Sequence, residues 1–279
     1  MSFDYIKERI WRKLQGWVGK LLSQARREVL IKAVIQAIPT YAMGCFKLPM
    51  GLCNEIEVMT RKFWWGQRGE KRKVHWLKWS EMTKSKNEGG MGFRDLALHN
   101  DSLLAKQAWR LLQDQDSLFY KIFKHRFFPN CSIMEAAESS RGSYAWKSIL
   151  HGRDVIKRGA CWRIGNGKDV QIWQHSWLPR KHPSHVQSPM LEGWEETTVN
   201  VLINEENWTL NEHLIDRLFI PEEAELVKKI PLSRHPVEDK VFWLWTQSGA
   251  YTCKSGYRFL KMEDEEEGHE DVQTGDKAF

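Results

Sequence analysis

The residues best suited to chemistry in this chain are cations that lie close to tryptophans. Nine of them fall into three groups, namely Arg26, Arg27 and Lys32, then Arg61 and Lys62, then Arg68, Lys71, Arg72 and Lys73. Because Lys and Arg bind phosphate oxygens while Trp rings stack on bases, this interleaving predicts nucleic-acid contact that is mainly to phosphates and tolerant of sequence. The alternative is a set of solvated helices that simply carry many cations.

The net charge of +6 is distributed unevenly along the 279 residues. Residues 1–190 hold 33 Lys and Arg against 16 Asp and Glu, whereas residues 191–279 hold 9 against 20. A basic segment attracts a phosphate backbone and an acidic segment is repelled by it. The sequence therefore predicts nucleic-acid binding by the first part of the chain and opposition to it by the last part.

Fifteen tryptophans give the chain an unusual amount of aromatic surface. A Trp ring brings a large apolar area and one N–H donor, so core packing is the expected role of any single one. Exposed tryptophans also anchor protein interfaces. A protein-interaction scaffold with Trp-rich surfaces is therefore the competing function.

The acidic residues do not form a recognisable catalytic site. Nucleotide polymerisation needs carboxylates that hold two Mg²⁺ ions, and no two aspartates are adjacent in this chain. Adjacent acidic pairs such as Glu195-Glu196 and Glu238-Asp239 are not placed between two apolar strand segments. Gly-x-Ser-x-Gly elbows and phosphate loops with Gly-Lys-Ser/Thr are absent as well. The sequence predicts that the chain has no active site and is not an enzyme.

The five cysteines predict neither disulfides nor a metal site. They are scattered, odd in number and free of Cys-x-x-Cys pairs, which is typical of reduced intracellular thiols. No metal or other cofactor is expected. No stretch approaches the roughly 20 apolar residues that span a bilayer, so we expect no membrane partner and a location in the nucleus or cytoplasm. The basic, amphipathic first 27 residues resemble a mitochondrial transit peptide, but Asp4 and Glu8 argue against one.

The cations are expected to be positioned by three N-terminal helices. An apolar stripe from Val29 to Ile38 predicts the first, which Pro39 should end. Helical spacing of Leu52, Ile56, Met59 and Phe63 predicts the second. A third helix should begin at Asn100 or Asp101 as its N-cap, after a basic, glycine-containing connector over residues 67–98.

The C-terminal half is expected to mix short helices with small hairpins. The elements predicted are a helix over 143–159, a β-hairpin over 161–173 with a Gly165-Asn166-Gly167 turn, a helix opening at Pro221, a strand over 241–246 returning over 250–252, and a helix from Cys253. The predicted fold is thus mainly α, and α+β overall.

Several motifs, in this order, carry a resemblance to a known family. They are Glu28-Val29-Leu30-Ile31-Lys32-Ala33-Val34, Phe63-Trp64-Trp65-Gly66, Gly89-Gly90-Met91-Gly92-Phe93-Arg94-Asp95, Leu104-Ala105-Lys106-Gln107-Ala108-Trp109-Arg110, Trp146-Lys147-Ser148-Ile149-Leu150 and Trp162-Arg163-Ile164-Gly165-Asn166-Gly167. Together they resemble the segment that follows the polymerase core in plant LINE-type (non-LTR) retrotransposon reverse transcriptases. One departure is Arg26, where that family typically has glycine.

A second set of residues resembles the opening of the zinc-binding region of these reverse transcriptases. It consists of Asp239, Trp243, Gly249, Tyr251, Lys254, Ser255 and Tyr257. The Cys and His residues that define that region come later in the family, so the match is partial. The resemblance implies a thumb and connection-like domain over 1–178 and the start of the zinc-binding region over 201–261. Prolines among polar residues predict a linker over 179–200, and the acidic composition predicts a disordered tail over 262–279.

The resemblance also implies what the chain does. In the parent polyprotein the catalytic palm lies upstream, the ribonuclease H domain lies downstream, and the thumb grips the template–primer duplex. We therefore expect a non-catalytic fragment that binds RNA–DNA or DNA duplex through the nine cations named above. The alternatives are the protein-interaction scaffold, whose partners are unknown, and a transposon remnant without function.

Overall fold

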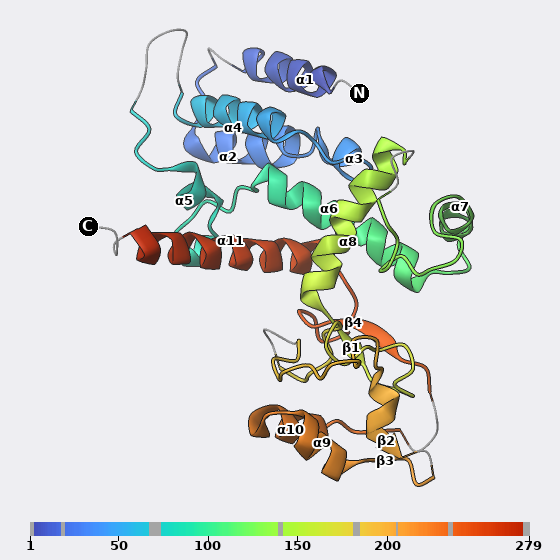
Figure 1. The fold of residues 1–279 in the computed structure, drawn as a ribbon. Helices are drawn as coiled ribbons and strands as arrows, with labels where there is room; N and C mark the ends of the chain where they lie inside the picture. The colour runs from blue at the N-terminus through green and yellow to red at the C-terminus, as the bar shows by residue number, and fades with distance from the viewer. Residues whose placement is uncertain are drawn as a thin grey trace. The chain divides into compact units, whose positions relative to one another are not determined.

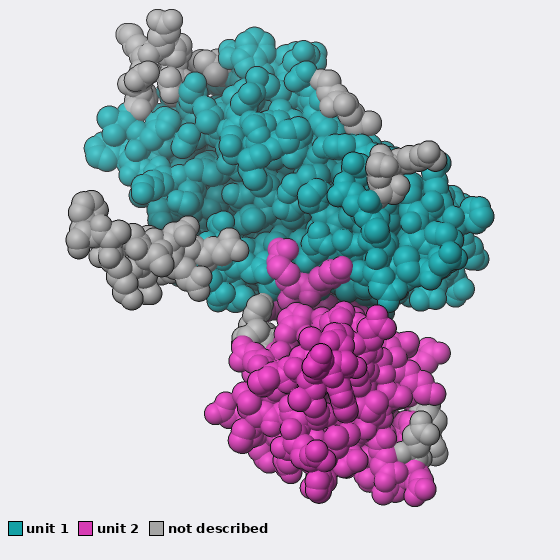
Figure 2. All heavy atoms as spheres, in the orientation of Figure 1, with its two compact units in different colours: residues 1–156, 252–279 teal, residues 157–251 magenta. Residues whose placement is uncertain are grey.

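The computed structural model describes residues 3–17, 20–66, 74–138, 142–180, 185–204, 206–233 and 237–275. The chain divides into two compact units (Figure 2). The first unit comprises residues 1–156 and 252–279, and the second comprises residues 157–251. Helices dominate and the sheets have two strands each, which confirms the predicted fold class.

The first unit is built from helices. They are α1 (Asp4–Gln15), α2 (Gln24–Leu30), a π-helical turn (Ile31–Ile35), α3 (Thr40–Met43), α4 (Met50–Trp64), α5 (Trp79–Thr83), a 3-10 turn (Lys86–Glu88), α6 (Leu96–Gln113), α7 (Leu118–Phe127), most of α8 (Tyr144–Gly159), and α11 (Cys253–Gly275). Helix α4 contacts α1, α2 and α6, and α11 packs along α6 (Figure 1).

The side chains that the first predicted helix buries are not those of the apolar stripe that the sequence indicated. Val29 is exposed, whereas Ile31 and Ile35 are fully buried. Ile31 and Ile35 belong to a π-helical turn (Ile31–Ile35), which has more residues per turn than an α-helix and so departs from the α-helical spacing that the prediction assumed. The helical segment ends at Ile35 with Gln36 as its C-cap, which is earlier than the predicted end at Pro39, and α3 begins at Thr40.

Helix α6 starts earlier than predicted. Its N-cap is Asp95, whose side chain accepts a hydrogen bond from the Leu98 N–H at 3.0 Å. Asn100, the predicted cap, is fully buried and serves another segment. Its amide accepts from the Leu48 N–H and donates to the Met43 and Phe46 carbonyls. The sequence identified a side chain that satisfies backbone groups but assigned it to the wrong helix end.

The second unit contains two small antiparallel sheets and two helices. Strand β1 (Ala160–Arg163) pairs with β4 (Lys240–Trp243), and β2 (Ile203–Asn204) pairs with β3 (Thr209–Leu210). Helices α9 (Glu212–Leu218) and α10 (Pro221–Lys228) and a 3-10 turn (Val199–Leu202) pack on this frame. Its core includes the fully buried Val170, Ile172, Leu178, Leu202, Ile215 and Val227.

The predicted hairpin over 161–173 is wrong, and Asp239 supplies the reason. Its carboxylate accepts hydrogen bonds from three backbone N–H groups, those of Gly165 at 2.6 Å, Gly167 at 3.0 Å and Asp169 at 3.0 Å. The Gly-Asn-Gly turn therefore binds the segment before β4, and β1 pairs with β4 instead of with residues 170–173. Gly165 is required here, because a Cβ on it would lie 2.3 Å from the Val237 carbonyl oxygen.

The predicted linker over 179–200 does not separate two units, because it falls inside the second unit. Among its described residues, Val199 and Ser188 are buried and Trp194 packs on the core of the second unit. The tail predicted to be disordered over 262–279 is instead helical as far as Gly275, where α11 ends. Residues 276–279 lie outside the described part. Residues 250–252, predicted as the return strand, form no strand. The backbone N–H of Trp243 at the end of β4 donates to the Gly249 carbonyl at 2.7 Å.

Among the described residues, no helix is both long enough and apolar enough to cross a membrane. Helix α11 has the length but carries a run of acidic side chains.

Candidate nucleic-acid interface

Three of the motifs found in the sequence meet in the first unit. The Arg27 guanidinium on α2 donates to the Trp64 carbonyl at the end of α4, at 3.0 Å. The Lys32 ammonium donates to the Met91 carbonyl at 2.7 Å. The rings of Trp64 and Phe93 meet edge to face, with centroids 5.3 Å apart. We call this contact between α2, the end of α4 and residues 89–95 the motif junction.

Two glycines make the motif junction possible. Gly66 has φ of +67°, and a Cβ there would lie 2.7 Å from the Arg27 guanidinium. A Cβ on Gly90 would lie 2.2 Å from the Lys84 carbonyl oxygen. The first position needs left-handed backbone and the second needs close backbone approach, and glycine provides both. These motifs therefore have a structural explanation in this fold.

The structure separates the nine predicted cations into three classes. Arg68, Lys71, Arg72 and Lys73 lie outside the described residues. Arg27 and Lys32 are held inside the motif junction, and Arg61 is half-buried on α4. Lys32 also forms an ion pair with Glu28 at 2.8 Å and lies 5.6 Å from the centre of the Phe93 ring. The two remaining cations, Arg26 and Lys62, are exposed to solvent.

The exposure of Arg26 also explains how the chain tolerates arginine where the similar family has glycine. Arg26 lies in the first turns of α2, behind the N-cap Ser23, whose hydroxyl accepts from the Arg26 N–H. Among the described non-glycine residues only Trp208 has a positive φ, so Arg26 is unstrained. Neither tight packing nor left-handed backbone is needed at this position.

Helix α1 supplies exposed cations that the sequence analysis did not select. Arg9, Arg12 and Lys13 are exposed, while Ile6, Ile10 and Leu14 bury the opposite face. An ion pair between Lys7 and Glu55 joins α1 to α4, the helix that carries Lys62. The basic amphipathic pattern of this segment is the sequence signal for these cations, and it is also the pattern of a transit peptide.

Acidic side chains lie in the same unit as these cations. Asp264, Glu265 and Glu266 are exposed on α11, and Lys261 of this helix donates to the Thr83 carbonyl at 2.8 Å. The first unit as a whole carries 31 Lys and Arg against 23 Asp and Glu, and the second carries 11 against 13. The first unit is therefore net positive by 8 and the second net negative by 2, a smaller contrast than the one between residues 1–190 and 191–279.

A group of titratable side chains gathers at the N-terminus of α6. The Leu96 N–H donates to the Glu57 carboxylate at 3.0 Å, and the Asp95 N–H donates to the Tyr257 hydroxyl at 3.0 Å. Burial raises the pKa of Glu57 to about 7 and that of Tyr257 to about 12, and it lowers the pKa of His99 to about 4. Such shifts are typical of catalytic sites, but here Glu57 and Tyr257 cap the start of α6, which gives them a structural role.

The pKa of Glu57 leads to a pH-dependent stability prediction. Because the folded value of about 7 exceeds the ordinary 4.5, the fold favours the protonated carboxyl. Its contribution is fully present below pH 4.5 and is lost as the pH rises through 7. Replacing Glu57 with glutamine should therefore leave stability near its wild-type value at pH 4.5 and raise it by about 1 to 3 kcal/mol at pH 8.

Urea unfolding of both proteins at the two pH values measures this difference. The matched control is Glu8→Gln on the exposed face of α1, which should change stability equally little at both. A Glu57→Gln variant that is no more stable than wild type at pH 8 would contradict the raised pKa.

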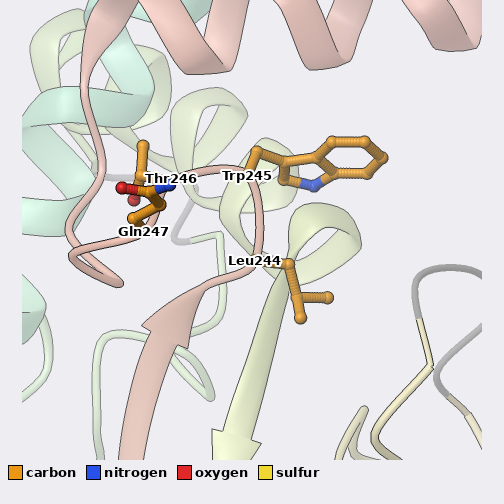
Figure 3. Close-up of a pocket in the computed structure, with 4 residues that line it drawn as sticks. All are labelled: Leu244, Trp245, Thr246 and Gln247. Atoms are coloured by element: carbon orange, nitrogen blue, oxygen red, sulfur yellow. The ribbon is translucent and has the colours of Figure 1, made fainter.

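Metal-binding groups and hollows are the next features of the part of the chain that the structure describes. No three His, Cys, Asp or Glu side chains there are grouped as a metal ion would require. A hollow of about 390 Å³ in the second unit is lined by Leu244, Trp245, Thr246 and Gln247 (Figure 3). Leu244 and Trp245 point away from Thr246 and Gln247 across this turn, and none of the four titrates near neutral pH.

Comparison of the sequence with known proteins identifies the family of the chain. No protein-family model matches the chain. It is 28% identical to the putative ribonuclease H protein At1g65750 of Arabidopsis thaliana over 94% of its own length, but it spans only 43% of that relative. It is also 40% identical to the uncharacterized mitochondrial protein AtMg00310 of Arabidopsis thaliana over 148 residues, which are 53% of this chain and 96% of that protein. The chain thus belongs to the family of the uncharacterized mitochondrial protein AtMg00310.

Proposed function

We propose that this protein is a non-catalytic nucleic-acid-binding fragment that derives from the post-palm region of a plant LINE-type reverse transcriptase. The observation that carries the proposal is the set of exposed cations on helices that pack against one another. Arg9, Arg12 and Lys13 lie on α1, Lys62 lies on α4, and Arg26 lies on α2. Helix α4 contacts both of the others (Figure 1).

The name of one relative supports a nucleic-acid partner. That relative is called a putative ribonuclease H protein, and similarity to it runs over nearly the whole chain. That name belongs to a protein of which this chain spans 43%, and it connects the chain with nucleic acid only in general terms. The duplex itself comes from the resemblance to reverse transcriptases, in which the thumb grips the template–primer duplex. The partner we propose is therefore RNA–DNA or DNA duplex, contacted at its phosphates without base recognition.

The burial of the tryptophans counts against the scaffold alternative. All fifteen lie in described residues, and five are buried while eight are half-buried. Only Trp11 and Trp76 are exposed. Because the aromatic surface is used mainly for the two cores, it offers no extended Trp-rich face to a protein partner.

Charge reversal on the exposed helices tests the proposal. The variant Arg12→Glu, Lys62→Glu, Arg26→Glu changes three exposed side chains and leaves Arg27 and Lys32 in the motif junction intact. If all three contact phosphates, the slope of log affinity against log salt should fall by about 1 for each, and affinity at low salt by at least about tenfold. Fluorescence anisotropy with a labelled RNA–DNA duplex from 25 to about 300 mM salt provides the measurement.

The matched control reverses three exposed lysines of the second unit, namely Lys168, Lys229 and Lys240. It changes the net charge by the same amount, so a purely global charge effect would weaken binding equally in both variants. Circular dichroism verifies that both variants keep their helices. Wild-type protein that does not bind duplex at low salt would leave the chain as a remnant without this function.

A further inference from the structure

One tryptophan stands apart from the other fourteen. Trp76 is 78% exposed, and its neighbours Val74 and Leu77 are 68% and 49% exposed. Exposing a large aromatic ring is unfavourable in water unless the ring has a partner. In a chain that buries or half-buries thirteen of its fifteen tryptophans, this exposure requires a reason.

The backbone on both sides of Trp76 is anchored. The His75 ring stacks on Trp65 with centroids 6.1 Å apart and an interplanar angle of 17°. The Trp79 ring stacks on the buried Phe93 at 5.6 Å and 15°. Both partners belong to the motif junction or lie next to it. The segment is thus held at residues 75 and 79 while the ring between them is presented to solvent.

The surroundings of Trp76 are basic. Lys78 is exposed two residues later, and Lys62 is exposed near the end of α4, three residues before the ring on which His75 stacks. The nearby Glu81 is paired with Lys84 at 2.8 Å. An exposed ring among cations suits a strand of nucleic acid, because bases stack on aromatic rings while cations hold the backbone.

We propose that Trp76 is a stacking platform for an unpaired base, so that the preferred ligand is a duplex with a single-stranded end. This inference rests on the proposed function, since the cations of the first unit must hold the adjoining phosphates. It deepens that function by adding a contact to a base where the exposed helices provide only contacts to phosphates. Stacking tolerates any base, so the preference is for an unpaired strand and not for a sequence.

Binding of two ligands tests the inference. One is a blunt RNA–DNA duplex and the other is the same duplex with a short single-stranded overhang. Trp76→Ala should weaken binding of the overhang ligand by about 5- to 150-fold, the range for loss of one base–aromatic stack. Affinity for the blunt duplex should stay unchanged. Trp76→Phe keeps a ring and should restore most of the loss.

Two controls make the result specific to the ring. An overhang that carries abasic positions should bind wild type and Trp76→Ala equally well. Tyr41→Ala removes another exposed aromatic ring, which is 86% exposed on α3, a helix that carries none of the proposed phosphate contacts, and should leave both affinities unchanged. Because Trp76 is exposed, its loss should not unfold the protein, and circular dichroism verifies this.

The outcomes distinguish the stacking inference from the proposed function. If wild type binds blunt duplex with the expected salt dependence but Trp76→Ala binds both ligands like wild type, stacking is refuted and phosphate binding stands. Equal weakening for both ligands also refutes stacking at an unpaired base. If wild type binds neither ligand at low salt, both proposals fail, and an exposed ring that anchors a protein partner becomes the explanation.

Discussion

Replacing Asp239 with alanine should destabilise the second unit by about 3 to 5 kcal/mol, because it leaves three backbone N–H groups, two of them buried, without their acceptor. Asp239 is 8% exposed, and its two oxygens accept from Gly165, Gly167 and Asp169. Hydrogen bonds to an ionised group are stronger than those between neutral groups. The loss also removes the contact that brings the turn after β1 to the segment before β4, so the strand pair should weaken too.

Hydrogen exchange measured by mass spectrometry would localise this effect. Peptides from β1 and β4 should lose protection in Asp239→Ala, while peptides from α1 and α4 should keep theirs. Asp239→Asn retains one carbonyl oxygen and should be intermediate, because its amide group faces an N–H donor. The exposed neighbour Glu238 provides the control, and Glu238→Ala should exchange like wild type. Uniform loss of protection in both units, or none, would contradict this role of Asp239.

Local patterns in the sequence predicted several helices correctly. The spacing of Leu52 to Phe63 indicates α4, Pro221 with two following glutamates indicates α10, and the helix from Cys253 is α11. Each depends on residues within a few turns of one another, so the information is local. The pairing of β1 with β4 is not local, because it depends on a carboxylate that lies far along the chain from the turn that binds it.

For the candidate interface, the sequence predicts which residues are cations but not which of them are exposed to a ligand. The sequence located the cations, but their roles depend on neighbours that folding brings in. Arg27 and Lys32 donate hydrogen bonds to the carbonyls of Trp64 and Met91. Arg26, the residue next to Arg27, is exposed. No periodicity distinguishes these fates, since all lie on the same short helical segment.

The place of the acidic residues could not be predicted either. The net charge of residues 191–279 predicts a separate acidic part that opposes binding, yet α11 belongs to the same unit as the exposed cations and packs along α6. Removing that part would expose α6 and delete the Tyr257 cap, so lost binding would not report on charge. Neutralising Asp264, Glu265 and Glu266 on intact α11 is the cleaner comparison.

The second large effect is expected at Gly152, where α8 crosses α6. A Cβ at this position would lie 2.3 Å from the Leu104 carbonyl carbon and 2.5 Å from the Ala105 nitrogen. These atoms are backbone, so they cannot rotate away as a side chain would. Overpacking costs about 1 to 3 kcal/mol, and this site belongs at or above the upper end. After the helix-propensity gain of about 1 kcal/mol, Gly152→Ala should still destabilise by at least about 2 kcal/mol.

Thermal unfolding followed by circular dichroism should show this as a decrease in Tm of roughly 4 to 8 °C for the first unit. The matched control is Gly51→Ala in α4, where a Cβ would meet nothing within 4 Å. There the same substitution brings only the propensity gain, so Tm should stay constant or rise. Because both changes add one methyl group to a helix, opposite signs would show that backbone contact between α6 and α8 decides the result. A Gly152→Ala variant as stable as wild type would mean that the two helices can separate without loss, and that their crossing does not depend on glycine.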